Sequence, residues 1–268
     1  MLKKKKSIKK WGFTTVIVAV APLRKSPNHR VEMVGQLLFG ESVHILAFNK
    51  TGWVKVKSLH DNYIGWVTSS MLNEKNTLKK PRKARYITGM PIQQLKWRGG
   101  TFTLSAGSSL PGYDLLAKKI LGDKAKLAGK IIDTSKQKAS VSTLKKLVAP
   151  WLNTPYLWGG RTVMGVDCSG FVQVIYKMMG FLLLRDADQQ ATQGKTIKDL
   201  SSAKPGDLLF FNRGKKIIHV GILYAPGLVI HSSGKVRIDV LTEKGIFNAE
   251  TKKQSHQLCL IKRVANFN

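Results

Sequence analysis

The sequence of 268 residues has few acidic side chains, few cysteines and no long apolar run. Only 15 Asp and Glu accompany 45 Lys and Arg, which gives a formal net charge of +30. Two cysteines exclude a disulfide framework and a zinc cluster built from cysteine. No stretch approaches the ~18 consecutive apolar residues that a membrane-spanning helix needs. The hydrophobic fraction of 43% excludes a disordered chain and is enough for the cores of two or three domains.

The positive charge is concentrated in the first half of the chain. Residues 1–150 contain 29 basic and 7 acidic side chains, whereas residues 151–268 contain 16 and 8. Such an excess suggests a nucleic-acid binder, because lysines can neutralise phosphates. The sequence shows no zinc-finger spacing and no recognition-helix pattern, and no aromatic residues interleave with the basic tract at 79–85. We therefore interpret the excess as a solvated lysine-rich surface, with no specific nucleic-acid partner and a non-specific attraction to anionic polymers.

The N-terminal segment has the form of an export signal, with basic residues 3–10, an apolar run at 16–20 and an A-x-A motif that ends at Ala21. Pro22 follows directly, and proline at that position generally blocks the processing peptidase. Residues 13–23 are also rich in β-branched side chains and precede a turn, as expected of a strand. We expect a cytoplasmic protein, with export to the cell envelope as the alternative.

The first 140 residues are expected to form one or two small β-barrels. Residues 13–75 contain valine-rich and aromatic runs at 43–46, 53–56 and 63–67, separated by Asn-, Asp- and Gly-containing turns. This order resembles a bacterial Src-homology-3-like (SH3-like) domain. A polar, basic linker follows at 76–85. In residues 86–140, the strand-like stretches 101–105 and 126–132 suggest a second, divergent small β-domain.

Residues 141–268 are expected to form an α+β domain. Apolar residues recur at three- and four-residue steps over 141–151, which predicts an amphipathic helix. A second apolar helix is expected from Asp167 to Met179. Turns and strands then alternate to residue 264, and helices followed by a run of strands are typical of this fold class.

Cys168 is the candidate nucleophile. It stands where a glycine-containing loop meets the start of a helix, so unpaired N–H groups and the helix dipole would favour its thiolate. His219 and His231 lie on predicted strands, and a cysteine, a basic histidine and a group that orients this histidine form the site of a thiol peptidase. The simpler interpretation is structural: a lone cysteine is usually a small core residue, which is how we interpret Cys259.

Five sequence strings carry a resemblance to the NlpC family of cell-wall cysteine peptidases. They are 154–160 (T-P-Y-L-W-G-G), 165–173 (G-V-D-C-S-G-F-V-Q), 205–211 (P-G-D-L-L-F-F), 219–222 (H-V-G-I) and 230–234 (I-H-S-S-G). The resemblance covers residues 144–264 and implies a papain-like α+β domain. It implies that Cys168 is the nucleophile, that His219 is the general base and acid, and that His231 orients His219. It implies no metal and no organic cofactor.

A finer resemblance concerns the γ-D-glutamyl-L-diamino acid endopeptidases of this family. It is carried by the string 185–187 (R-D-A), by Gln190, and by 32–41 (E-M-V-G-Q-L-L-F-G-E) in the SH3-like domain. This subgroup requires a free N-terminal L-alanine on the stem peptide, which suits the recycling of cell-wall fragments. The substrate-binding residues that the resemblance implies are Tyr156, Asp167, Ser169, Arg185, Asp186, Glu32 and Tyr63.

The sequence thus favours a thiol endopeptidase that releases L-Ala-D-Glu from peptidoglycan-derived peptides. Two alternatives remain. The Cys-His-His site could serve an amidase or an acyltransferase, because one fold can host several reactions. The chain could instead be a non-enzymatic wall- or polyanion-binding protein in which the barrels and lysines do the binding.

Overall fold

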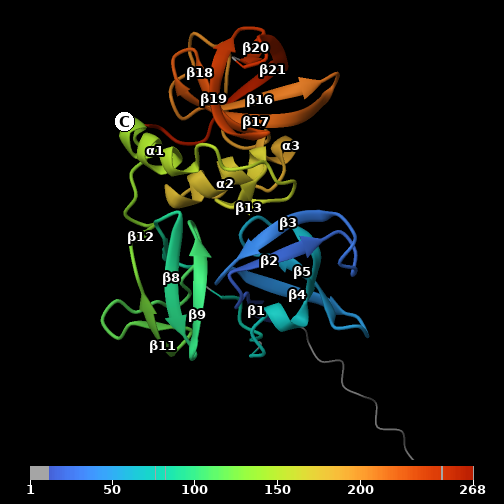
Figure 1. Cartoon of the computed structure of the whole chain (residues 1–268), viewed down its shortest axis with the longest axis vertical. Helices are drawn as coiled ribbons and strands as arrows, with labels where there is room; N and C mark the ends of the chain where they lie inside the picture. Colours follow the sequence, from blue (N-terminus) through green and yellow to red (C-terminus); the bar gives the residue numbers. More distant parts are fainter. Residues whose placement is uncertain (1–11, 76, 82, 249, 268) are drawn as a thin grey trace, which may run out of the picture.

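The computed structural model describes residues 12–75, 77–81, 83–248 and 250–267, so the basic segment 3–10 lies outside the described residues. The described chain is mostly β-structure with a few short helices. Figure 1 shows a large sheet at one end and a layer of helices beneath it. Two smaller β-units lie side by side on the other side of the helices.

The first β-unit is a six-stranded antiparallel sheet with the order β1-β4-β5-β6-β2-β3. Alternation of buried and more exposed residues in β5, where Val54 and Val56 are fully buried and Lys55 and Lys57 are not, produces its core face. The strands expected at 43–46, 53–56 and 63–67 are confirmed. The elements are β1 (Phe13–Thr15), β2 (Val20–Arg24), β3 (Met33–Leu38), β4 (Ser42–Phe48), β5 (Trp53–Ser58), β6 (Ile64–Thr68) and the 3-10 helix η1 (Ser69–Met71).

The second β-unit contains a four-stranded sheet with the order β10-β11-β8-β9 and a two-stranded sheet, β12-β7. The stretch 126–132 was expected to form one strand but forms parts of two. Gly129 separates them with a φ of +101°, and a side chain there would lie 2.9 Å from Gln93 Nε2. The strands are β7 (Tyr86–Thr88), β8 (Ile92–Trp97), β9 (Gly100–Ser105), β10 (Lys119–Ile120), β11 (Asp123–Leu127) and β12 (Ile131–Asp133).

The C-terminal unit combines helices with a seven-stranded sheet of order β15-β21-β16-β17-β18-β19-β20. The expected helices at 141–151 and 167–179 are confirmed, and so is the α+β class. The helices are α1 (Val141–Val148), η2 (Ala149–Trp151), α2 (Cys168–Met178) and α3 (Ala187–Gln190). The strands are β13 (Arg161–Thr162), β14 (Gly165–Val166), β15 (Lys195–Ile197), β16 (Leu208–Arg213), β17 (Lys216–Ala225), β18 (Leu228–Ser233), β19 (Lys235–Thr242), β20 (Gly245–Asn248) and β21 (Lys253–Arg263).

Helix α2 is the centre of this unit. All of its residues are buried, and Phe171 and Ile175 share one core with Val220 and Ile230 of the sheet. Its polar residues Gln173 and Lys177 are buried as well and bond to Asp61 and Glu41 of the first β-unit. The sheet covers one side, and Figure 1 shows the two small β-units on the other.

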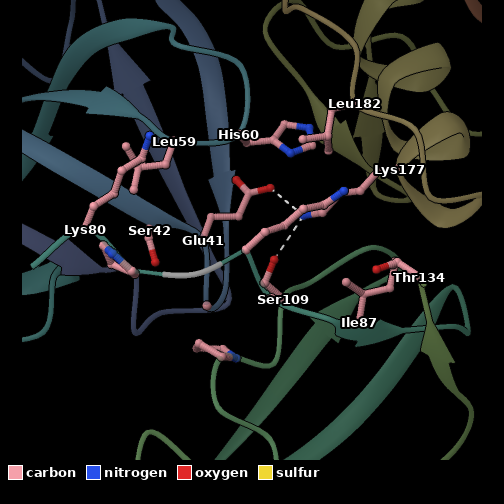
Figure 2. A pocket seen from close by; sticks show the side chains of 15 residues that line it. Glu41, Ser42, Leu59, His60, Lys80, Ile87, Ser109, Thr134, Lys177 and Leu182 are labelled. Atoms are coloured by element: carbon pink, nitrogen blue, oxygen red, sulfur yellow. Dashed lines mark hydrogen bonds and ion pairs between the residues drawn. The ribbon is translucent and has the colours of Figure 1, made fainter.

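A buried ion cluster joins the three units (Figure 2). Glu41, directly before β4, accepts hydrogen bonds from both terminal nitrogens of Arg161 at 2.8 and 3.0 Å and from Lys177 at 2.7 Å. Lys177 also donates to Ser109 of the second β-unit at 3.2 Å. Because all three charged side chains are at least 95% buried, this cluster fixes the relative positions of the units.

Candidate active site

Cys168 is the first residue of α2 and is 7% exposed. Asp167 is the N-cap residue, and its Oδ1 accepts a hydrogen bond from the N–H of Gly170 at 2.6 Å. A side chain at Gly170 would come within 2.2 Å of the carbonyl oxygen of Gly160, so only glycine fits there. The string D-C-S-G therefore starts the helix and holds the sulfur at its N-terminal end.

The two predicted histidines lie on neighbouring strands and are in contact. His219 (β17) has its Nε2 2.8 Å from Nδ1 of His231 (β18), and Nε2 of His231 is 3.1 Å from Oδ2 of Asp239 (β19). A carboxylate can only accept, so this network assigns the proton of His231 to Nε2. His231 Nδ1 then accepts from Nε2–H of His219, which leaves Nδ1 of His219 as the free basic nitrogen.

The free protein holds Cys168 and His219 in their neutral forms. Burial raises the pKa of Cys168 to about 12, and the charge of Asp167 adds to this effect. The N–H groups of Val220 and Ser169 lower the pKa of the thiol in part, as expected for a helix start, but burial outweighs them. Burial also lowers the pKa of His219 well below 6.5. Any attack by the sulfur therefore requires a base that takes the thiol proton, a role proposed below for His219.

A third histidine covers His219. The ring of His256 (β21) stacks on that of His219 with centroids 4.2 Å apart and planes 27° apart. The same ring lies edge-on to Phe211, at 6.0 Å. Burial lowers the pKa of His256 to about 4, so its ring is neutral near pH 7. His256 thus holds the base in position without adding a charge next to it.

A cavity of about 420 Å³ opens beside Cys168 and brings together six of the seven predicted substrate-binding residues. The exception, Arg185, is 2% exposed and lies behind the wall. It donates to both oxygens of Asp167, at 3.1 and 2.5 Å, and to Ser169 Oγ at 2.9 Å. The residues that line the cavity include Tyr156, Asp167, Ser169, Asp186, Glu32 and Tyr63 from the prediction, together with Trp158, Asp188, Arg213 and Lys216.

Two hydrogen bonds close the cavity between the first β-unit and the C-terminal unit. Tyr63 donates its hydroxyl hydrogen to Asp186 Oδ2 at 2.9 Å, and Trp158 Nε1–H donates to Glu32 Oε1 at 3.0 Å. Burial raises the pKa values of Tyr63 and Asp186. The first β-unit therefore supplies part of the wall around the nucleophile.

The cavity is lined by both acidic and basic side chains. Asp186 and Glu32 keep acceptor capacity beside the hydrogen bonds from Tyr63 and Trp158, because each carboxylate oxygen has two lone pairs. Asp167 is neutralised by the buried Arg185, whereas Glu32 pairs only with the exposed Lys25, at 3.4 Å. Arg213 and Lys216, which are exposed at the β16–β17 turn, also line the cavity. The site can therefore hold a molecule that carries both an ammonium group and carboxylates.

Sequence reasoning missed Asp239, His256, Trp158 and the basic pair of the β16–β17 turn. The register of their strands brings Asp239 to His231 and His256 to His219. In the sequence, only the alternation of residues along these strands indicated which side chains point toward the site. The interpretation of Cys259 as a buried core residue is wrong, because its side chain is exposed. Leu260 pairs with Phe210 and Leu258 with Phe211, so Cys259 is the additional residue of a β-bulge.

The described residues contain no cluster of three or more His, Cys, Asp or Glu side chains that could hold a metal ion. None of the helices in this part of the chain is long and apolar enough to cross a membrane. A second cavity of about 310 Å³ lies at the junction of the three units, around Glu41 and Lys177, and is distinct from that of Cys168 (Figure 2).

Comparison with known proteins gives matches over both parts of the chain. A family profile described as NlpC/P60 family matches residues 153–254, and one described as bacterial dipeptidyl-peptidase Sh3 domain matches residues 23–72. The chain is 32% identical over 249 residues to a γ-D-glutamyl-L-lysine dipeptidyl-peptidase of Bacillus subtilis (strain 168), across 85% of this chain and 80% of that protein. It is 27% identical to dipeptidyl-peptidase 6 of Lysinibacillus sphaericus, across 85% of this chain and 92% of that protein.

A crystal structure of an NlpC/P60 family protein from Bacillus cereus ATCC 10987 has the same fold. It superimposes with a TM-score of 0.77 over 95% of this chain and 100% of that chain, at 20% identity. The expected fold class, SH3-like sheets followed by a papain-like domain, is thereby confirmed.

Proposed function

Because the chain belongs to the NlpC/P60 family and is a cysteine peptidase, we propose that it hydrolyses one bond of peptidoglycan stem peptides. This is the bond between γ-D-glutamate and the diamino acid, in peptides whose N-terminal L-alanine is free. The name of the Bacillus subtilis relative supports this bond as the substrate. We also propose that the protein acts in the recycling of cell-wall fragments and that it is located in the cytoplasm.

The polarity of the cavity is the observation that carries the proposal. An L-Ala-γ-D-Glu-diamino acid peptide has an ammonium group at its N-terminus and carboxylates on its D-glutamyl and diamino acid residues. The carboxylates of Glu32 and Asp186 suit the ammonium group. The cationic side chains of Arg213 and Lys216 suit the carboxylates.

The proposed reaction uses Cys168 and His219 as nucleophile and base. His219 Nδ1 takes the thiol proton while Sγ attacks the γ-carbonyl carbon of D-glutamate, and N–H groups at the start of α2 stabilise the oxyanion. The C–N bond breaks, and His219 gives its proton to the leaving amine. A water then attacks the thioester and loses a proton to His219, the C–S bond breaks, and L-Ala-D-Glu leaves with the thiol restored. His231 and Asp239 hold the imidazole in the required tautomer.

The test compares L-Ala-γ-D-Glu-meso-diaminopimelate with its N-acetylated form, followed by mass spectrometry. Loss of a charged partner in a desolvated site costs about 2–5 kcal/mol, so we expect the acetylated peptide to be cleaved about 30-fold more slowly or worse. Cys168→Ala should cleave neither. Cleavage of both peptides at equal rates would retain the chemistry and reject the ammonium site, and cleavage of neither by the wild type would reject the substrate.

Asp186→Asn tests how much the Asp186 carboxylate contributes to the preference for a free amine. Asparagine still serves as the N-cap of α3, so folding should be kept while the charge is removed. The preference for the free amine should fall about tenfold, mainly through KM. Glu74→Gln, an exposed acid outside this cavity, makes the same change in net charge and should leave the preference unchanged.

A further inference from the structure

One face of the sheet β10-β11-β8-β9 is exposed and basic. Along β8 and β11 the residues alternate, so that Leu95, Trp97 and Ala125 are buried while the residues between them face solvent. The exposed residues on these four strands include no acid. They are Ile92, Gln94, Lys96, Thr101, Thr103, Lys119, Lys124 and Lys126. We call Lys96, Lys119, Lys124 and Lys126 the lysine face.

The strand register places these lysines opposite one another. Lys119 pairs with Lys124, and Lys126 pairs with Lys96. Directly opposite residues have Cβ atoms about 4.5–5.5 Å apart, and like charges in such pairs destabilise a sheet. None of the described carboxylates lies within salt-bridge distance of these four ammonium groups, and the acid nearest in register is Asp114, which forms an isolated β-bridge with Lys119. The only acid on these strands, Asp123, pairs with Arg98 instead, at 2.6 Å. The sheet therefore carries two unfavourable cross-strand pairs side by side.

The surroundings extend the positive surface. A shallow hollow at the end of the β8–β9 hairpin is lined by Lys96, Arg98 and Lys124. The guanidinium of Arg98 lies 4.2 Å from the ring centre of Trp97, which orients it next to this hollow. Thr101, opposite Lys96 in the register, adds a neutral donor. A side chain at Gly99 would meet nothing within 4 Å, so the rim of the hollow is open.

We propose that the lysine face binds a linear phosphodiester polymer of the polyol-phosphate type. Lysine ammonium groups are point charges that suit phosphate. Two residues along a strand are about 6.8 Å apart and paired strands about 4.8 Å, so the four charges form a grid for successive phosphates of an extended chain. Bound phosphates would also remove the repulsion between the paired lysines. The binding of phosphate would thus explain why like charges stand opposite one another in this sheet.

The same face does not suit a nucleic acid. Reading a duplex requires a helix or a β-ribbon that enters a groove, and this surface is the flat side of a sheet. Single strands are held by bases stacked on exposed aromatic rings, and none of the described outward-facing residues on these four strands is aromatic. The sheet lies across the helical layer from β16–β19 (Figure 1), so a bound polymer would leave Cys168 accessible. The inference is independent of the peptidase reaction.

The test measures binding of fluorescent poly(glycerol phosphate) to the full chain as a function of salt. One variant replaces the four lysines of the lysine face by glutamine. A control variant replaces four exposed lysines from separate parts of the chain, Lys50, Lys136, Lys195 and Lys244. Both variants lose the same net charge, so any difference between them reports on position.

Each phosphate contact contributes a slope of about −0.7 to a plot of log K against log salt concentration. We expect the lysine-face variant to flatten the slope by about 2–3 and the control variant to keep it. Cys168→Ala should bind like the wild type. Equal losses in the two variants would overturn the proposal, since net charge alone would then explain binding. Tighter binding of oligothymidylate than of poly(glycerol phosphate) would overturn the choice of polymer.

Thermal unfolding supplies a second criterion. Removal of two like-charge pairs should raise the melting temperature of the lysine-face variant above that of the control. A melting temperature below that of the control would show that these lysines stabilise the sheet, which would remove the reason to assign them a ligand.

Discussion

Glu41→Gln should loosen the junction that joins the three units. The substitution keeps the shape of the side chain but removes the carboxylate that forms ion pairs with both Arg161 and Lys177, which are 1% and 5% exposed. Asp61 would then be the remaining described carboxylate that attracts these two buried cations. Removal of one partner of a buried ion pair costs about 3–5 kcal/mol. Arg161 keeps its bond to the carbonyl of Gln36 and Lys177 keeps its bond to Ser109, so we expect the lower end of this range.

At ~3 kcal/mol, the expected fall in melting temperature is about 6–12 °C for a chain of this size. Differential scanning calorimetry at pH 7 measures it, with Asp123→Asn as the control. The control breaks an ion pair whose side chains are 34% and 46% exposed, and such surface pairs contribute about 0.2–1 kcal/mol. A Glu41→Gln protein that melts within 2 °C of the control, a difference below that expected from ~1 kcal/mol, would refute the reasoning.

The effect of Glu41 should also depend on pH. Burial alone would raise the pKa of Glu41, but Arg161 and then Lys177 outweigh burial and hold the pKa far below its ordinary value of 4.5. The unfolded chain therefore takes up a proton near pH 4.5 while the folded protein does not. The stabilisation by Glu41 is complete above pH 4.5 and decreases as the pH falls below it. The difference between wild type and Glu41→Gln should shrink accordingly, and a constant difference down to pH 3 would contradict the assigned charge.

Three further predictions concern the active site. Asp239→Asn should lower kcat about 10²-fold or more with little change in KM, because the amide can donate to His231 and favour the wrong tautomer of that ring. An unchanged kcat would show that Asp239 does not set the tautomer of His231. As the pH is lowered, kcat/KM should begin to fall only well below pH 6.5, because His219 stays deprotonated down to its lowered pKa. A fall in kcat/KM that begins at or above pH 6.5 would contradict this. His256→Ala should lower kcat about tenfold, because His219 loses the ring that holds it in place. His256→Phe keeps a stacking ring, so its kcat should come within about twofold of the wild type. Equal losses of kcat in the two variants would show that stacking does not position His219.

The elements of this protein that were predictable are those with a local sequence signal. The strand W-V-K-V-K alternates along its own length, and the string D-C-S-G contains both the N-cap and the glycine that the helix start needs. Contacts set by register were not predictable. Asp239 reaches His231 because β18 pairs with β19, and His256 reaches His219 across β16, which pairs with both β17 and β21. The bulge that exposes Cys259 depends on the partner strand in the same way.

The charge state of Cys168 could not be predicted from its position at a helix start. The helix N-terminus acts in the expected direction, but burial and Asp167 act against it. Which of these contributions dominates depends on how much of the sulfur is covered, and that depends on the packing of β17 against α2, far along the chain. The roles assigned to Cys168, His219 and the cavity residues remain proposals that the experiments above test.

Tyr63 and Glu32 of the first β-unit form hydrogen bonds with the C-terminal unit. The proposed ammonium site and the proposed reacting groups therefore come in part from different segments of the chain. Glu32 precedes the nucleophile by 136 positions and belongs to a different sheet. Exchange of the first β-unit between homologues could therefore change which peptides enter the site while the reacting groups stay intact. The same order means that a ribosome-bound nascent chain contains Glu32 and Tyr63 before Cys168, and Cys168 before Asp186 and the two histidines.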